Sequence, residues 1–294
     1  MVNGIINVYK EKGFTSFDVV AKMRGIYHQK KIGHTGTLDP DAEGVLPVCL
    51  GKATKVCDML TDRDKEYRAV MLLGVTTDTQ DVTGEVLKES SVEASEKDVR
   101  QAVMKFVGKI DQIPPMYSAL KVNGQKLCDL AREGIVIERK PRSVSIISIE
   151  ILSVNLPKVE MLIHCSKGTY IRSLCRDIGE KAGCGACMSS LVRTRVGVCT
   201  LDKAYKLSEI EKLVKAGSVF EIITPTEDMF PDYPAIIVSG REEMFAKNGN
   251  MLKLSDVKGD VIKVFLSDGR FAGVFAYDSV SECYRPEKMF LSEN

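Results

Sequence analysis

The first fifty residues pass through patterns typical of a strand, a helix and a loop. Apolar and polar residues alternate over residues 4–9 as in a short strand, and Thr15 and Ser16 can cap a helix over residues 17–24, whose apolar side chains recur on one side. Residues 29–44 break both periodicities with glycines and a proline in a polar stretch. We therefore predict a strand, a helix and a long ordered loop, a kind of segment that often carries function.

Strand and helix patterns then follow one another in irregular order. Apolar residues at helical spacing predict helices over residues 54–60, 96–106, 126–133, 171–182 and 207–215. Runs of β-branched and apolar residues predict strands over residues 45–50, 67–73, 144–153, 159–165 and 192–199. Because some strand patterns succeed one another with no helix between them, we predict an α+β fold with a mixed, largely antiparallel sheet flanked by helices, rather than a doubly wound parallel sheet.

A change in composition predicts a domain boundary near residues 224–234. Prolines and acidic residues gather there, as is typical of a linker: Pro225, Pro231, Pro234, Glu221, Glu227, Asp228 and Asp232. We expect one domain over residues 1–230 and a small β-rich domain over residues 231–294. The second domain shows strand patterns at 236–238, 261–266 and 270–277, a hairpin turn at 267–269 and a short helix after Ser239.

Composition and charge exclude several classes of protein. The chain is 44% hydrophobic and 28% charged, which does not fit a disordered, collagen-like or coiled-coil protein. Its net charge of +1 means that a polyanionic partner must be held by a local patch. With no apolar run near the roughly 18 residues that span a bilayer and no signal-peptide pattern, we expect neither a secreted nor a membrane protein. The 9 cysteines fit reduced thiols of the cytoplasm.

The loop over residues 29–44 holds the first candidate for chemistry. Pro40 biases Asp39 toward extended backbone, and nearby glycines permit turns, so the Asp39 carboxylate can be held outward as a nucleophile. A turn in which Asp39 only bonds to local backbone is an alternative that the residues leave open. Asp41 and Glu43 follow at alternate positions, so a carboxylate pair, as in a nucleoside or glycan hydrolase, also stays open.

The second candidate segment runs from the strand pattern at 159–165 into the helix pattern near residue 171. This order places Tyr170 and Arg172 in the first turn of the helix, beside the end of the sheet. An arginine next to an aspartate lowers the pKa of the acid by roughly 1 to 3 units, so we expect Arg172 to keep such a partner ionised. A surface ion pair is the alternative interpretation of Arg172 alone.

Basic residues concentrate in the same part of the chain. Residues 165–197 carry six basic and two acidic side chains, a local charge of +4. Together with further lysines, namely Lys30, Lys31, Lys52, Lys55 and Lys121, this patch is suited to follow a phosphate backbone. A solvated face is the alternative interpretation of any one of these charges.

One pair of cysteines admits a metal site. Cys184 and Cys187 have the spacing of half a zinc site. The chain has no second pair of this spacing and only 3 histidines, so we expect no metal.

Five motifs, in this order, resemble the TruB family of tRNA pseudouridine-55 synthases. They are GHTGTLDP at 33–40 with GVLP at 44–47 and GKATK at 51–55; KEYRA at 65–69 with GVTTDTQDVTG at 74–84; PPMYSALK at 114–121; KGTYIR at 167–172; and LVRT at 191–194. The resemblance covers about residues 1–225. It implies an isomerase that breaks the N-glycosidic bond of a uridine in the T arm of tRNA, turns the base and joins its C5 to the ribose. It implies no cofactor and no metal.

The resemblance also implies roles for particular residues. By it, Asp39 is the catalytic aspartate, Tyr67 stacks on the target base and Arg172 is the partner of Asp39. The remaining site residues implied are Tyr170 and Leu191 as walls of the uracil pocket, His34 as a support for the opened RNA loop, and Lys55 and Asp81 as supporting groups. A base inside a folded loop must be flipped out at a cost of a few kcal/mol, and stacking on an aromatic ring returns about 1 to 3 kcal/mol.

For the whole chain, the resemblance implies a pseudouridine synthase domain over residues 1–230. Residues 231–294 depart from the family's pattern: they lack a clear signature of the RNA-binding PUA module found in many relatives, and their β-rich pattern is compatible with a reduced, PUA-like domain. We expect a cytoplasmic, monomeric enzyme that acts on tRNA without a guide RNA, a membrane or an obligate protein partner. A tRNA-binding folding factor without catalysis is the alternative from another class of function.

Overall fold

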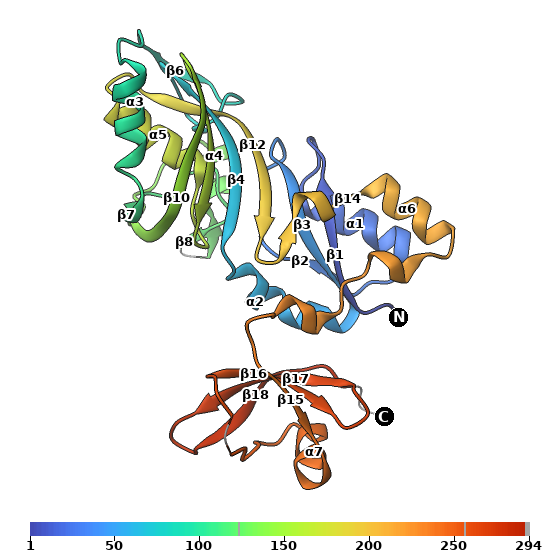
Figure 1. Ribbon diagram of the computed structural model, residues 1–294. Coiled ribbons are helices and arrows are strands. Elements are labelled where there is room, and N and C mark those ends of the chain that lie inside the picture. Colours follow the sequence, from blue (N-terminus) through green and yellow to red (C-terminus); the bar gives the residue numbers. More distant parts are fainter. Residues whose placement is uncertain (123, 256, 292–294) are drawn as a thin grey trace.

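The computed structural model describes residues 1–291 except 123 and 256. Its main feature is a large sheet with strand order β14-β1-β3-β12-β4-β11-β10-β7, to which β2 adds beside β3 and β13 beside β12 (Figure 1). The strands of this sheet are β1 Gly4–Lys10, β2 Ile32–His34, β3 Glu43–Leu50, β4 Lys65–Leu73, β7 Gly108–Gln112, β10 Arg142–Asn155, β11 Lys158–Cys165, β12 Ala186–Val196, β13 Cys199–Thr200 and β14 Tyr205–Lys206.

Helices cover two parts of this sheet. Figure 1 shows α3 and α5 beside the half built from β4, β10 and β12, and α1 and α6 beside β1 and β3. The helices are α1 Ser16–Tyr27, α2 Cys57–Thr61, α3 Glu96–Met104, α4 Leu127–Arg132, α5 Ile171–Lys181, α6 Leu207–Lys215 and α7 Gly240–Lys247, with 3-10 turns at Gly51–Val56, Leu201–Lys203, Val219–Ile222 and Thr226–Met229. No helix of the described residues is long and apolar enough to cross a membrane.

The sheet confirms the predicted α+β class. Among its described strand pairs, only β1 with β14 and β3 with β12 run parallel, and the others run antiparallel. Strand β4 shows the alternation expected of a sheet with one face packed on helices. Tyr67, Ala69 and Met71 belong to the core that α3 and α5 complete, and the residues between them are less buried. A sheet with one face on helices produces the alternating pattern that the sequence displays.

Most predicted boundaries shift by a few residues, and three segments differ more clearly from the structure. Residues 32–34, inside the predicted loop, form β2, because pairing with β3 satisfies their backbone groups. The strand predicted at 192–199 begins at Ala186 and ends at Val196, since Gly197 turns the chain with φ of 53°. The helix predicted at 54–60 is a 3-10 turn followed by the short α2.

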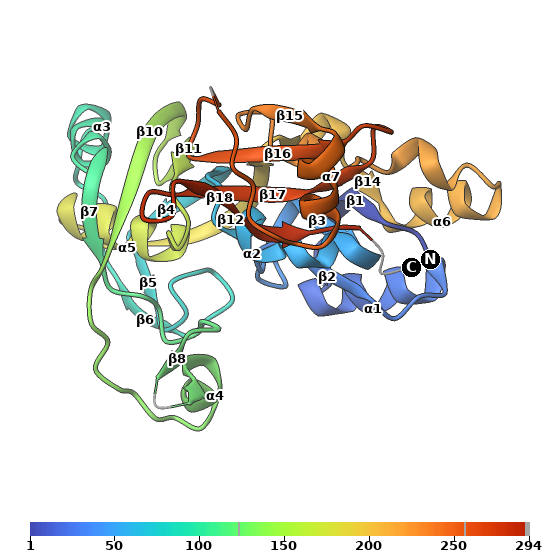
Figure 2. The same cartoon turned by 90° about the horizontal axis from the view of Figure 1, so that it is seen from below.

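Two small hairpins lie beside the large sheet. They are formed by β5 Val75–Thr77 with β6 Val86–Glu89, and by β8 Lys121–Val122 with β9 Gln125–Lys126. Figure 2 shows that the segment with β8 and α4 projects away from the rest of the chain. It has a small core of its own around Leu127 and Leu130.

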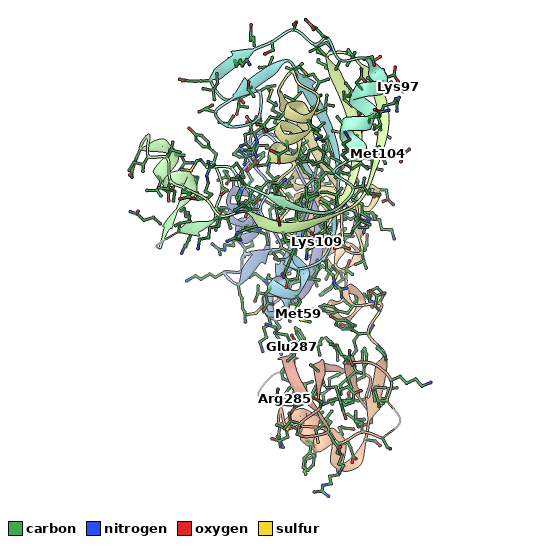
Figure 3. All side chains as sticks on the ribbon, turned by 90° about the vertical axis from the view of Figure 1, so that its left-hand side faces the viewer. Met59, Lys97, Met104, Lys109, Arg285 and Glu287 are labelled. Carbon is green, nitrogen blue, oxygen red and sulfur yellow. The ribbon has the colours of Figure 1, made fainter. Side chains whose placement is uncertain are left out.

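The last part of the chain forms a separate four-stranded sheet. Its order is β15-β16-β17-β18, with bounds Ala235–Val238, Val261–Leu266, Phe271–Asp278 and Cys283–Met289. It has its own apolar core, yet Val274 and Phe290 pack in one cluster with Ile5 and Val45 of the large sheet. In Figure 3, Met59 of α2 and Glu287 of β18 mark the two sides of this junction.

Candidate active site

An open pocket of about 580 Å³ lies where the loop after β2 meets β4, β12 and the start of α5. This volume is within the range of ligand pockets. Five of the residues that the sequence singled out line it, namely Asp39, Tyr67, Tyr170, Arg172 and Leu191. Its wall also includes Gly36, Leu38, Lys65, Ser118, Arg142, Lys167 and Arg193.

The loop that carries Asp39 is fixed by buried polar groups. The Asp39 carbonyl accepts a hydrogen bond from the Ala42 amide (3.1 Å). The Ser16 hydroxyl accepts a hydrogen bond from the amide of Leu38, the residue before Asp39 (2.9 Å). The fully buried Lys10 ammonium donates to the carbonyls of Pro40 (3.0 Å) and Ala42 (2.6 Å). Burial lowers the pKa of Lys10 to about 8. The turn is therefore closed by backbone and by Lys10, which leaves the Asp39 carboxylate available.

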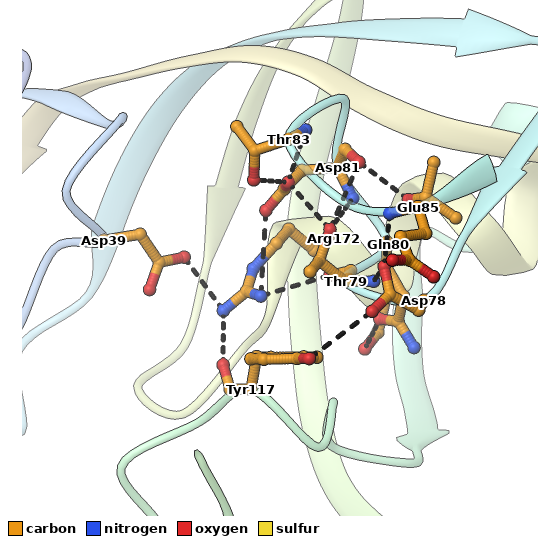
Figure 4. Close-up of polar contacts among 11 residues, drawn as sticks. Asp39, Asp78, Thr79, Gln80, Asp81, Thr83, Glu85, Tyr117 and Arg172 are labelled. Atoms are coloured by element: carbon orange, nitrogen blue, oxygen red, sulfur yellow. Dashed lines mark hydrogen bonds and ion pairs between the residues drawn. The ribbon is translucent and has the colours of Figure 1, made fainter. Parts of the chain in front are cut away.

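Arg172 joins the Asp39 loop to two other segments. Its Nη2 lies 2.9 Å from Asp39 Oδ2, and its side chain is only 6% exposed. The guanidinium also donates to the carbonyls of Thr79 (3.1 Å) and Tyr117 (2.7 Å), as Figure 4 shows. Three bonds in different directions fix the planar guanidinium, so the predicted partnership of Arg172 with Asp39 is present in the geometry.

Asp81 stands behind this pair rather than in the pocket wall. Its Oδ1 accepts hydrogen bonds from the Thr79 hydroxyl (2.9 Å) and the Thr83 amide (3.0 Å), and its Oδ2 lies 3.8 Å from Arg172 Nη1 (Figure 4). Asp81 therefore contacts Arg172 on the side away from Asp39 and does not itself line the pocket.

The pKa of Asp39 reflects two opposing effects. Burial raises the pKa of Asp39 above its ordinary value, the Arg172 guanidinium lowers it and the Asp81 carboxylate raises it again, with a net upward shift. Arg172 therefore acts in the expected direction, but desolvation outweighs the ion pair, so Arg172 limits the rise of the pKa without reversing it. The Asp39 side chain is 42% exposed, so the carboxylate can still meet a ligand in the pocket.

Tyr67 lines the pocket from near the start of β4. Its side chain is buried, and burial raises the pKa of its hydroxyl. Arg193 of β12 lies next to it, 1% exposed, and donates to the carbonyls of Val45 (2.8 Å) and Gly36 (3.1 Å). Arg193 thus ties the Asp39 loop to the sheet.

Sequence reasoning did not select Arg193 as a site residue. Two features of the sequence could have indicated it. Arg193 belongs to the motif at 191–194, and its partner in the neighbouring strand, Gly44, is a glycine. Gly44 has φ of 104°, and a Cβ there would lie 2.3 Å from the Arg193 carbonyl oxygen. Only glycine allows this close pairing of β3 with β12.

Tyr170 and Leu191 stand on the wall as predicted. Tyr170 is the residue before α5, and the Gln112 side chain bonds to both its amide (2.8 Å) and its carbonyl (2.9 Å). Leu191 projects from β12 and is 8% exposed. Together they contribute an aromatic ring and an apolar side chain to the pocket wall.

Lys65 is a second residue that sequence reasoning missed. It is buried at the start of β4, and its ammonium donates to the carbonyls of Thr61 and Arg63 (2.5 Å to the latter). Burial lowers the pKa of Lys65 to about 8. No spacing in the sequence distinguishes such a lysine from an exposed one.

Besides Asp81, two further predicted substrate-binding residues, His34 and Lys55, lie outside the pocket wall. His34 is on β2 with its ring 5.6 Å from that of Phe17, in an edge-to-face contact. Lys55 donates to the carbonyl of Met289 in β18 (2.7 Å), so its ammonium is directed to the junction with the last sheet.

The alternative carboxylate pair is not assembled in the pocket. Asp41 lies 3.6 Å from the Lys12 ammonium, and Glu43 accepts a hydrogen bond from the Tyr9 hydroxyl (3.2 Å). Neither is part of the pocket wall in the described part of the chain.

The predicted basic patch is also not a continuous surface. Arg172 and Arg193 are buried, and Arg176 is paired with Asp177 (2.5 Å). Counting charge along the chain could not show this, because burial removes two of the six cations from the surface. Cys184 and Cys187 are buried free thiols, and the described residues contain no metal-binding group of three or more His, Cys, Asp or Glu side chains.

Comparison with known proteins places this geometry in a family. Residues 24–171 match the model of the TruB family pseudouridylate synthase N-terminal domain, and residues 172–230 match that of the tRNA pseudouridylate synthase B C-terminal domain. The chain is 55% identical to tRNA pseudouridine synthase B of Lachnoclostridium phytofermentans, over 99% of this chain and 100% of that protein. It is 46% identical to the protein of the same name from Clostridium tetani, over 93% and 95%.

Solved structures agree with the sequence matches. A chain of an H/ACA RNP bound to a substrate RNA containing 2′-deoxyuridine superimposes with a TM-score of 0.75 at 25% identity, covering 99% of this chain and 86% of that one. A chain of a Cbf5-Nop10-Gar1 complex gives 0.75 at 28% identity, covering 98% and 85%. The two domain matches and the end-to-end identity show that this chain belongs to the TruB family of pseudouridylate synthases.

Proposed function

We propose that this tRNA pseudouridine synthase isomerises the uridine at position 55, in the T arm of tRNA. The carrying observation is the Asp39 carboxylate, held at 2.9 Å by the buried Arg172 guanidinium in the wall of the pocket. Curated relatives that match the chain end to end carry the name tRNA pseudouridine synthase B, which supports tRNA as the substrate.

The reaction rearranges bonds without an external reagent. The bond from N1 of uracil to C1′ breaks, the base turns, and C5 bonds to C1′. The proton on C5 leaves and N1 gains one, so atoms balance. Asp39 in its ionised form acts on the flipped nucleotide as the nucleophile or base, and Arg172 supports that form by its charge.

The other pocket residues hold the base while it turns. Tyr67 offers an aromatic ring for stacking, which is worth about 1 to 3 kcal/mol per base and offsets part of the cost of flipping. Tyr170 and Leu191 line the pocket and supply apolar contacts for the uracil. Asp81 keeps Arg172 in place from behind.

We further propose that the enzyme works without a guide RNA or an obligate protein partner, as a monomer in the cytoplasm, where tRNA is found. The chain matches the full length of the curated tRNA-named relative but only 86% and 85% of the chains in the two RNA-protein complexes. Residues 1–230 form the catalytic domain and residues 231–294 a PUA-like RNA-binding domain, supported by the separate sheet and core of the latter.

Tritium release tests this function. Purified protein is incubated with an unmodified tRNA transcript labelled at C5 of uridine, and released tritium and free uracil are measured. We expect tritium release without free uracil, and no release when uridine 55 is replaced by cytidine. Free uracil would indicate a hydrolase, and undiminished release from the cytidine transcript would place the target elsewhere.

A further inference from the structure

Phe17 is an exposed aromatic residue that the proposed reaction does not use. It lies at the start of α1, and 71% of it is exposed. Its ring meets that of His34 edge to face, at 89° and with centroids 5.6 Å apart, and its large exposed fraction leaves ring surface open for another flat group. A large apolar side chain held outward in this way is suited to contact with a partner.

His34 supports the same surface with a neutral ring. Burial is the larger cause and the nearby Arg193 charge the smaller cause of a lowered pKa of His34, so its imidazole is mostly uncharged at pH 7. Its Nδ1 is buried and has no hydrogen-bond partner within the described residues. A neutral aromatic pair stacks on nucleobases without regard to their sequence.

This aromatic pair adjoins the pocket. Ser16, next to Phe17 in the chain, accepts a hydrogen bond from the amide of Leu38 (2.9 Å), a residue of the pocket wall. His34 precedes another wall residue, Gly36, by two positions. Phe17 is therefore next in the chain to a residue that contacts the pocket wall, so its ring lies close to the pocket proposed to bind the target base.

Positive charge continues along the same face of α1. Phe17 and Arg24 are seven residues apart, the spacing of one helix face, and Arg24 Nη2 donates to the Ile32 carbonyl of β2 (3.4 Å). Lys30 and Lys31 are exposed just before β2. We name these five residues the α1–β2 strip: Phe17, Arg24, Lys30, Lys31 and His34.

Only one acidic side chain is part of the first turn of α1. It is Asp18, whose carboxylate is bound by the amide (2.8 Å) and hydroxyl (2.6 Å) of Thr15 in the helix cap. The net charge of the strip therefore stays positive.

The combination of an exposed aromatic ring with a row of cations is what single-stranded nucleic acid requires. Resting on the proposed function, we propose that the α1–β2 strip binds the RNA next to the target uridine: Phe17 stacks on a second, unstacked base of the loop, and Arg24, Lys30 and Lys31 bind the phosphates that follow. Flipping of the target breaks the loop's own stacking, so a neighbouring base becomes available for this contact.

Phe17 variants test the stacking. We measure kcat/KM for tritium release from a T-arm hairpin with wild type, Phe17→Ala and Phe17→Tyr. We expect Phe17→Ala to lower kcat/KM about 5- to 100-fold, as stacking on one base implies, and Phe17→Tyr to stay within about 3-fold of wild type. Because the side chain is exposed, thermal unfolding of Phe17→Ala should match wild type, which separates stacking from misfolding.

A matched pair on α1 tests the phosphate contacts. Lys22 lies over the Phe14 ring (5.3 Å) on a different face from Arg24. We measure how the logarithm of the hairpin-binding constant falls with the logarithm of the salt concentration. We expect Arg24→Gln to make this slope shallower by about 0.7, because one phosphate contact is lost, and Lys22→Gln to leave the slope unchanged.

The outcomes are distinguishable from failure of the proposed function. If wild type releases no tritium, the proposed reaction is wrong, and hairpin binding by the Phe17 and Arg24 variants still tests the strip. If wild type is active while Phe17→Ala retains full kcat/KM, or Arg24→Gln and Lys22→Gln have equal salt slopes, the strip does not bind RNA.

Discussion

Asp39 illustrates how one residue combines two opposing effects. Partial burial disfavours its negative charge, whereas Arg172 favours it, and the desolvation effect is the larger. A carboxylate with a raised pKa binds a proton more strongly than free aspartate does, which suits a group that must react with a nucleotide.

The pH profile of the reaction tests this environment. Asp39 is reactive when ionised, so activity is present above its pKa and is lost as pH falls through it. We expect the acid limb of kcat/KM in wild type above the ordinary value of 3.8. Asp81→Asn removes a negative charge that raises the pKa of Asp39, so its acid limb should move to lower pH. A limb that moves to higher pH would contradict the assignment.

Arg172 has a structural as well as an electrostatic role. Arg172→Ala leaves the carbonyls of Thr79 and Tyr117 without their donor in a buried place. We expect the free energy of unfolding to fall by about 1–3 kcal/mol, and kcat to fall at least 10-fold. Arg172→Lys should be intermediate in both, because an ammonium lacks the planar fork. Denaturant unfolding and tritium release measure the two effects, and an Arg172→Ala protein with wild-type kcat would exclude a role beside Asp39.

Among single elements, the loop between β2 and β3 shows which features of the site a sequence can indicate and which it cannot. Its glycines, Pro40 and Asp39 indicated a fixed, exposed carboxylate. The buried Lys10 that fixes it is distant in sequence, and β2 is too short to show a period. Contacts between distant segments, such as Arg193 with Gly36, were likewise not encoded in any local pattern.

Lys10→Met tests whether the loop must be held. The change leaves the carbonyls of Pro40 and Ala42 without their ammonium donor, so residues 39–42 should exchange amide protons faster. We expect kcat to fall about 10-fold with little change in tRNA affinity, since misplacing a reacting group by an ångström is costly. Lys12→Met, at an exposed lysine paired with Asp41, is the control and should keep wild-type kcat. Equal kcat in both variants would show that Lys10 does not position Asp39.

At the scale of the whole molecule, the junction between the two sheets depends on apolar packing more than on charge. Phe290, the residue after β18, is buried in the cluster that includes Ile5 and Val45, whereas the Lys288–Asp58 pair (2.6 Å) is partly exposed. The sequence indicated the linker and the β-rich tail, but not this shared cluster. Residues that pack between domains look the same in sequence as residues that pack within one.

Two substitutions compare these contributions. Phe290→Ala removes a buried ring, and we expect the free energy of unfolding to fall by about 3–5 kcal/mol. Lys288→Ala breaks an ion pair that solvent screens, and we expect a change below about 1 kcal/mol. Denaturant unfolding of both variants compares the contribution of apolar packing with that of the ion pair. A larger loss for Lys288→Ala than for Phe290→Ala would mean that charge, not packing, holds the sheets together.

The central claim is that the Asp39 carboxylate acts directly on the uridine, and comparison with the neighbouring Asp41 tests it most directly. Asp39→Asn and Asp41→Asn make the same chemical change two residues apart in one loop, and Asp41 lies outside the pocket wall. In single-turnover tritium release from tRNA, we predict no detectable release by Asp39→Asn, with tRNA affinity within several-fold of wild type, and wild-type release by Asp41→Asn. Turnover by Asp39→Asn at a rate near that of wild type would contradict the account.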